Sequence, residues 1–195
     1  METSRLEAFS DGVLAIIITV MVLELKVPHG TSLTVLEPIL PVFLCYILSF
    51  VYLGIYWNNH HHMFQLAKKV TGAILWANLH LLFWLSLIPF TTAWLGENHF
   101  ETLPSALYGV VLFMAALAYW LLQKTILIAQ GKDSILAKAI GSDLKGKISP
   151  ALYLTAILIS FFQVWIADLI YVFVALIWLV PDKRIERILA LTEKE

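Results

Sequence analysis

The sequence predicts an all-α integral membrane protein with six transmembrane helices. Its 195 residues are 60% hydrophobic and only 14% charged, whereas an average soluble domain carries about 25% charged residues. The mean hydropathy of +0.82 also indicates a membrane protein, and the seven Trp and seven Tyr residues suit anchoring at the membrane–water interface. Membrane lipid is therefore an expected partner. The net charge of −1 gives no indication of a nucleic-acid partner.

Four stretches are each long and apolar enough to cross a bilayer, whose hydrocarbon core of about 30 Å requires roughly 20 residues of helix. They cover approximately residues 9–27, 38–65, 70–95 and 103–124. Pro28 and Gly30 follow the first stretch and end it, whereas Pro38 and Pro104 stand where the first turn of a helix tolerates proline. We do not expect a cleaved signal peptide, because acidic residues precede the first stretch and no small-x-small site follows it.

The last apolar region, 148–181, contains 34 residues. A single helix of this length measures about 51 Å at about 1.5 Å per residue, which is too long for one crossing. Two shorter spans, about 149–163 and 165–181, fit better. The turn between them is expected near Gln163–Trp165, with Asp168 in the first turn, or at the N-cap, of the second helix.

The distribution of Lys and Arg supports six spans. With the N-terminus in the cytoplasm, Lys26 is the only one of the 13 Lys and Arg residues on the outer side, where Glu24 is expected to meet cations, Lys26 or solvent. Five spans would export the basic residues of 183–195, against the positive-inside rule. We therefore expect both termini in the cytoplasm, one membrane domain over 1–182 and a cytoplasmic tail over 183–195. The linker from Lys124 to Lys147 is expected to lie along the membrane surface.

The first span carries an apolar stripe on one face. A helix advances about 100° per residue, so Ile16 and Leu23 lie within about 20° of each other, with Thr19 and Val20 within about 60° on either side. Such a stripe could be an ordinary packing surface. The Thr19 hydroxyl could equally bond back to the carbonyl of Ala15.

A polar cluster precedes this stripe, because Arg5, Glu7, Ser10 and Asp11 stand within seven residues. Asp11 lies about 140° from Ile16 at about 100° per residue, so the cluster and the stripe face different neighbours. Arg5 and Asp11 are six residues apart and do not form an i,i+4 pair. Their partners are expected on another helix or subunit, since ionisable groups within a membrane usually pair. The candidates are Asn78 and His80 on the third span and the run Asn58–His62 on the second.

Arg5, Phe9, Ser10 and Asp11 together spell an RxxxFSD motif at the head of the first span. In this position the motif resembles that of the prokaryotic relatives of transmembrane protein 175, the endolysosomal potassium channel. The resemblance covers the whole chain, including histidines late in the second span and tryptophans in the third. It implies a homotetrameric, potassium-permeable channel in which the first helix of each subunit lines a central pore.

The resemblance also implies roles for individual residues. The family's pore constriction matches Ile16, with further pore positions at Thr19, Val20 and Leu23. A structural network that holds the pore helices is implied for Arg5, Phe9, Ser10 and Asp11, together with Asn78 and His80. The sequence lacks the TVGYG filter of conventional potassium channels, so selectivity for K⁺ is expected to come from side chains. The expected location is the inner (plasma) membrane of a bacterium or archaeon.

Two other functions remain open at this point. One is a proton-coupled or small-solute transporter with Asp11 and His80 as the relay, although the chain shows no internal repeat of the kind common in transporters. The other is a membrane scaffold without transport. We expect no enzyme and no cofactor, because no HExxH, GxSxG or phosphate-binding glycine loop occurs. His60, His61 and His62 point about 100° apart on a helix, so no metal is expected beyond permeating K⁺.

Overall fold

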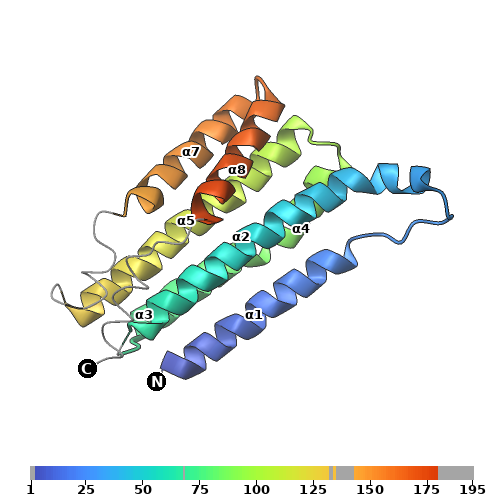
Figure 1. Cartoon of the computed structure of the whole chain (residues 1–195). Coiled ribbons are helices and arrows are strands. Elements are labelled where there is room, and N and C mark those ends of the chain that lie inside the picture. The colour runs from blue at the N-terminus through green and yellow to red at the C-terminus, as the bar shows by residue number, and fades with distance from the viewer. Residues whose placement is uncertain (1–2, 68, 132–133, 135–142, 180–195) are drawn as a thin grey trace.

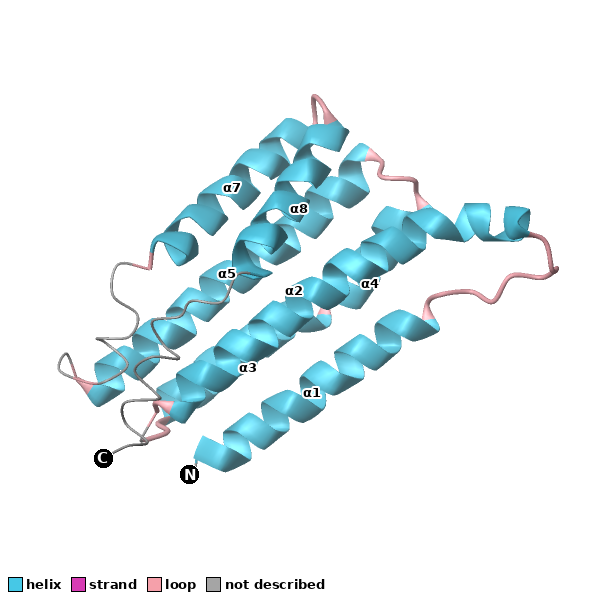
Figure 2. Ribbon diagram, viewed as in Figure 1, coloured by secondary structure: helices cyan, strands magenta, loops and turns pink. Residues whose placement is uncertain are grey.

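Helices make up the regular structure of the described part of the chain (Figures 1 and 2). The computed structural model describes residues 3–67, 69–131, 134 and 143–179, and all structural statements concern these residues. The expected tail, the end of the expected last span and part of the expected surface linker lie outside them. The elements are α1 (Thr3–Leu23), the 3₁₀ helix η1 (Leu33–Ile39), α2 (Leu40–Gln65), α3 (Gly72–Ser86), α4 (Ile88–Glu97), α5 (Thr102–Gln130), α7 (Leu144–Ser160) and α8 (Val164–Leu179).

The helices form an elongated bundle, with α1 along one edge and the α7–α8 hairpin on the opposite side (Figure 1). Helices α2, α3 and α4 pack on α1, whereas α7 packs on α5 and α8. One apolar core joins α1, α2, α3, α5 and Ile88 of α4, and a second joins α2, α5, α7, α8 and Leu95 of α4. Because α2 and α5 contribute to both cores, they connect the two sides of the bundle.

Helix α1 buries only one edge. Its buried positions recur every three or four residues, as in an amphipathic helix: Leu6, Ser10, Leu14, Ile17 and Met21. The helix begins at Thr3, six residues before the expected span of 9–27, and ends at Leu23, four residues before the expected end of that span. The chain then runs without helix to Pro28, which lacks a backbone N–H to donate.

The third expected span, 70–95, is divided into two helices. Helix α3 ends at Ser86, and α4 begins at Ile88 with Pro89 in its first turn. Proline lacks the N–H that would continue the helical ladder, and its ring conflicts with the carbonyl four residues earlier. The expected third span thus contains a break at Leu87. The two helices together still form one apolar stretch, Gly72–Glu97, of membrane-crossing length.

Four apolar helical stretches of the described residues are long enough to cross a membrane: Thr3–Leu23, Leu33–Gln65, Gly72–Glu97 and Thr102–Gln130. The last two helices are shorter and form a hairpin joined at Phe161–Gln163. Asp168 consequently lies in the second turn of α8, and its carboxylate accepts a hydrogen bond from the Ser105 hydroxyl of α5 at 2.7 Å. The expected position of Asp168 in the first turn or at the N-cap of the last helix is therefore wrong, because the hairpin turns earlier in the chain.

Candidate functional site: the exposed face of the first helix

The four residues expected in the pore all lie on the exposed face of α1. Ile16, Val20 and Leu23 are 64%, 39% and 75% exposed in the protomer, and Thr19 is exposed as well. Ile17, the next residue after Ile16, is only 5% exposed. The protomer thus leaves a continuous apolar face of α1 without a neighbour. A face of this kind meets lipid, another subunit or a pore.

The Thr19 hydroxyl donates a hydrogen bond to the carbonyl oxygen of Ala15 at 2.8 Å. This local bond is a common arrangement for threonine within a helix. A hydroxyl has one donor hydrogen and two acceptor lone pairs, so the Thr19 oxygen can still bind a group on the exposed face. The local bond and an outward-facing oxygen are compatible.

A buried chain of hydrogen bonds joins the opposite edge of α1 to α2 and α3. The Asn78 side-chain amide donates to the Ser10 hydroxyl oxygen at 2.9 Å, and the Ser10 hydroxyl donates to the Leu6 carbonyl at 2.9 Å. The His60 Nε2 atom lies 2.7 Å from the Asn78 amide oxygen. An amide oxygen only accepts, so His60 carries its proton on Nε2. Ser10, Asn78 and His60 are each at most 1% exposed, which places this chain in the interior between three helices.

A second set of polar contacts joins α1 to α2 near the same end of the helix. The Trp57 indole N–H donates to the Asp11 carboxylate at 3.0 Å, and the Glu7 carboxylate lies 2.5 Å from His61 Nδ1. Glu7 and Asp11 are four residues apart, as are Trp57 and His61, so the two pairs form parallel rungs between antiparallel helices. The Trp57 and His61 rings also stack, with centroids 6.0 Å apart.

The partner of Asp11 is therefore none of the expected residues. It is Trp57, which immediately precedes the expected run 58–62 on α2. The sequence indicates no role for Trp57, and it places Glu7 in the polar cluster without a partner of its own; that partner, His61, lies within the expected run 58–62. The signal for both was their four-residue spacing from Asp11 and His61, which places each pair on one helix face. Which faces meet depends on the register between α1 and α2, and the sequence does not state that register.

Other residues of the expected network lie apart from these contacts. Arg5 and Phe9 stand on the exposed side of α1, and Phe9 is 51% exposed. The His80 Nε2 atom accepts a hydrogen bond from the Trp84 indole on its own helix at 3.0 Å. Within the described part of the chain, no hydrogen bond connects His80 with Asp11.

The three consecutive histidines do not converge. His60 meets Asn78, whereas His61 meets Glu7 and the Gln65 amide. Among the described residues, no three His, Cys, Asp or Glu side chains are grouped so that they could hold a metal ion.

An ion pair secures the chain beyond the other end of α1. The Lys26 ammonium lies 2.5 Å from the Glu97 carboxylate at the end of α4, and both side chains are largely exposed. Glu24 is exposed and is not the partner of Lys26. The segment after α1 is thus tied to α4.

These features define an α-helical integral membrane protein whose first helix is held by polar contacts on one side and exposes an apolar face on the other. The chain belongs to the TMEM175 family. The family model described as the endosomal/lysosomal potassium channel TMEM175 matches residues 5–89, which include nearly all of α1 and the whole of α2 and α3.

The similarity to known members extends over almost the full chain. A protein named as a potassium channel from Chryseobacterium sp. (strain P1-3) is 60% identical over 187 residues, which cover 96% of this chain and 97% of the relative. A protein named as a potassium channel from Chamaesiphon minutus (strain ATCC 27169 / PCC 6605) is 35% identical and aligns with 85% of this chain and 88% of its own. The crystal structure of a lysosomal potassium-selective channel TMEM175 homolog from Chamaesiphon minutus is similar with a TM-score of 0.78. It is 30% identical and covers 93% of this chain and 98% of that chain.

Proposed function

We propose that the protein is a potassium-permeable channel of the plasma membrane. The named potassium channels of Chryseobacterium and Chamaesiphon, which align with most of the chain, support this function. The observation that carries the proposal is the exposed face of α1, formed by Ile16, Thr19, Val20 and Leu23 within the region matched by the family model. Ions pass down their electrochemical gradient, and no covalent chemistry is required.

The proposed channel is a homotetramer with its pore on the symmetry axis. One protomer offers a single helix with this exposed face, so closed rotational symmetry has to supply the remaining walls. Each protomer crosses the membrane six times and keeps both termini in the cytoplasm. Helices α7 and α8 contain 17 and 16 residues. At about 1.5 Å per residue they measure about 25 Å, and local thinning of the bilayer accommodates spans of this length.

Four Ile16 side chains form the constriction of the proposed pore. Water leaves an apolar neck when the neck is narrow, and an ion then enters only at a high cost in hydration. Thr19 stands almost one turn further along α1, where four hydroxyl oxygens replace part of the water shell of K⁺. Selectivity in this proposal depends on the width of the neck and on these side chains.

The polar contacts of Ser10 and Asp11 hold the proposed pore helix from behind. They occupy the edges of α1 that face α2 and α3, away from Ile16. We therefore assign them to assembly and to the orientation of α1, with no direct contact to the ion.

Planar-bilayer recording of the purified protein tests the proposal, with K⁺ on one side and Na⁺ on the other and with the mass of the assembly measured in mild detergent. We expect a cation current whose reversal potential favours K⁺, from a particle with the mass of four chains. A conducting monomer or dimer would contradict the tetramer. Intact tetramers without conductance would indicate a scaffold, and saturable flux driven by a pH gradient would indicate a transporter.

A further inference from the structure

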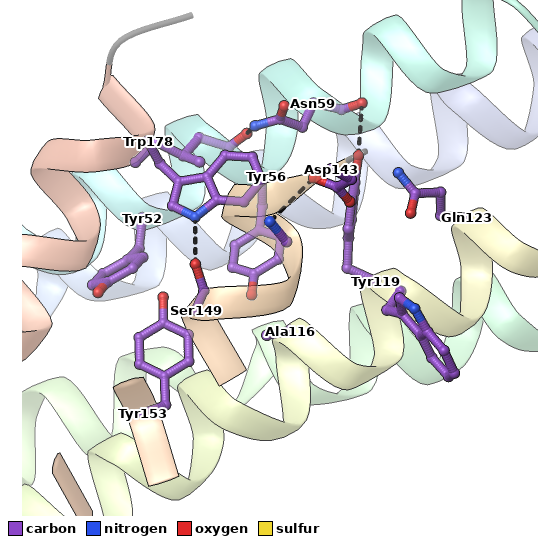
Figure 3. A pocket seen from close by; sticks show the side chains of 13 residues that line it. Tyr52, Tyr56, Asn59, Ala116, Tyr119, Gln123, Asp143, Ser149, Tyr153 and Trp178 are labelled. Carbon is purple, nitrogen blue, oxygen red and sulfur yellow. Dashed lines mark hydrogen bonds between the residues drawn. The ribbon is translucent and has the colours of Figure 1, made fainter. Parts of the chain in front are cut away.

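A cavity between α2, α5, α7 and α8 has no part in the proposed pore (Figure 3). Its inner space is about 40 Å³, whereas one buried water requires roughly 10–15 Å³. The cavity opens to the outside of the protomer through a mouth. The inner part therefore accommodates a group of a few heavy atoms, and the mouth admits the rest of a larger molecule.

Aromatic rings dominate the wall of this cavity. Six of them come from α2, α5, α7 and α8: Tyr52, Tyr56, Tyr119, Trp120, Tyr153 and Trp178. The face of an aromatic ring carries a negative potential that attracts ammonium groups. Two of these rings already hold ammonium groups of the chain itself. The Lys124 Nζ atom lies 4.2 Å from the Trp120 ring centroid, and Lys145 Nζ lies 6.0 Å from that of Trp178.

Hydrogen bonds hold several of these rings in position. The Trp178 indole donates to the Ser149 hydroxyl at 2.8 Å, and the Tyr119 hydroxyl donates to the Asn59 carbonyl at 3.3 Å (Figure 3). The Tyr52 hydroxyl donates to a backbone carbonyl of α8 at 2.6 Å. A ligand that enters the cavity therefore meets walls that are already ordered, which lowers the entropy lost on binding.

Asp143 adds a negative charge to the cavity wall. Among the described residues that line the cavity, it is the one charged side chain. Its Oδ1 atom accepts the backbone N–H of Gly146 at 3.1 Å and so caps α7. A carboxylate offers about four acceptor positions, so this cap leaves acceptors for a ligand. Aromatic faces beside a carboxylate favour a cation over an anion or a neutral molecule.

The cavity lies at one end of the α7–α8 hairpin. Asp143 immediately precedes α7, and Trp178 is the last residue but one of α8. The side chains of Trp120, Trp178, Lys124 and Lys145 gather around this cavity, a combination typical of a membrane interface. Phospholipid head groups also lie at the membrane interface.

We propose that this cavity binds an organic ammonium group, the chemistry shared by zwitterionic phospholipid head groups and free amines. The ammonium lies between the aromatic rings beside Asp143. The nearby Lys124 and Lys145 repel a bare cation and attract a phosphate. We therefore expect a bare ammonium such as choline to bind through the rings and Asp143, and an ammonium joined to a phosphate, as in phosphatidylethanolamine or phosphatidylcholine, to bind more tightly. This site is independent of the pore, so its test does not depend on conduction.

Binding of small probes to the detergent-solubilised protein tests the chemistry. Choline and its neutral carbon isostere, 3,3-dimethyl-1-butanol, have the same shape and differ in charge. We expect saturable choline binding by ligand-observed NMR and none by the isostere. Equal binding of the two would overturn the proposal, because recognition would then be apolar. Failure of both choline and the zwitterionic lipids to bind would overturn it as well.

Native mass spectrometry of protein mixed with defined lipids distinguishes a lipid head group from a free amine as the source of the ammonium group. Retention of phosphatidylethanolamine or phosphatidylcholine over phosphatidylglycerol identifies a lipid head group as the ligand, whereas specific choline binding without lipid retention identifies a free amine. Both outcomes support an ammonium site. Retention of phosphatidylglycerol equal to that of phosphatidylethanolamine would overturn the proposal, because phosphatidylglycerol has no ammonium group.

Two variants locate the site. Asp143→Asn removes the charge and keeps a side-chain oxygen that can cap α7, and Trp120→Leu removes one ring face. Each should weaken ammonium binding roughly tenfold. Glu101→Gln and Trp76→Leu are the matched controls, because both residues are exposed and neither lines the cavity. Unchanged binding in both site variants, with unfolding temperatures equal to that of the wild-type protein, would refute the assignment.

Discussion

Truncation to alanine should lower the stability mainly at Ile17 and alter ion permeation mainly at Ile16, the adjacent residue. Ile17 is 5% exposed and packs in the core between α1, α2 and α3. Its replacement by alanine removes three carbon atoms and leaves a cavity of roughly 80 Å³; the cavity term alone, at about 24 cal/mol per Å³, lowers the stability by about 2 kcal/mol. Ile16 is 64% exposed in the protomer, so its truncation leaves little buried space to fill. We expect Ile16→Ala to cost well under half as much.

Ion permeation, in contrast to stability, should change more in Ile16→Ala than in Ile17→Ala. Ile16→Ala widens the proposed neck, so the conductance should rise and discrimination among K⁺, Na⁺ and larger cations should fall. Ile17→Ala should leave the permeability ratio close to that of the wild-type protein. Denaturant or thermal unfolding in detergent measures the stability, and bilayer recording under asymmetric K⁺ and Na⁺ measures permeation.

The comparison is informative because any change in a membrane core can disturb a channel. Ile17→Ala therefore serves as the control for non-specific damage, one residue away on the same helix. If Ile17→Ala alters the permeability ratio as strongly as Ile16→Ala, the pore does not face the Ile16 side of α1. A loss of about 2 kcal/mol on Ile16→Ala would lead to the same conclusion, since it would place Ile16 in a packed interior.

Three further predictions concern the packing behind the proposed pore. Asn78→Leu should lower the free energy of unfolding by roughly 1–3 kcal/mol, because it removes the acceptor of the buried His60 Nε2, while Ser10 keeps its bond to the Leu6 carbonyl; a neutral result in denaturant unfolding would show that the His60 bond adds no stability. Asp11→Ala removes the acceptor of an indole N–H and should cost about 0.5–1.5 kcal/mol. Its tetramer yield should fall while its K⁺/Na⁺ permeability ratio stays constant, and a changed ratio at normal yield would place this residue in the ion path. Gly109→Ala should cost about 1–3 kcal/mol, because its Cβ would overlap the Tyr171 hydroxyl, whereas Gly54→Ala, with nothing within 4 Å, should be tolerated in the same unfolding measurement.

Much of the arrangement of α1 could be predicted from the sequence. The helical period alone placed Ile16 and Leu23 together and Asp11 on another side, because side-chain direction along a helix follows from residue spacing. The four long apolar stretches were equally accessible, since hydropathy and length suffice to identify them. Both kinds of inference use information that is local in the chain.

Contacts between helices could not be predicted in the same way. The pairing of Asp11 with Trp57, and of Asp168 with Ser105, depends on how far one helix is shifted along its neighbour. Many such shifts satisfy the same hydropathy pattern. The break between α3 and α4 had a visible signal in Pro89, but proline is also tolerated within membrane helices when neighbours satisfy the freed backbone groups. The aromatic cavity has no local signal, because its walls come from four helices distant in sequence.

The polar attachments of α1 lie at its ends, whereas its middle is held by the apolar packing of Leu14, Ile17 and Met21. Hydrogen bonds hold it as far as Asp11, and the ion pair of Lys26 with Glu97 holds the segment beyond its last turn. In the part of the chain that the structure describes, no hydrogen bond joins residues 12–23 to another helix. Apolar packing is not directional, so the middle of α1 can shift while its anchoring hydrogen bonds stay intact. In the proposed tetramer, an outward shift of every α1 would change the diameter of the neck at Ile16 by twice that shift. Gating of the proposed pore would then require no anchoring bond to break.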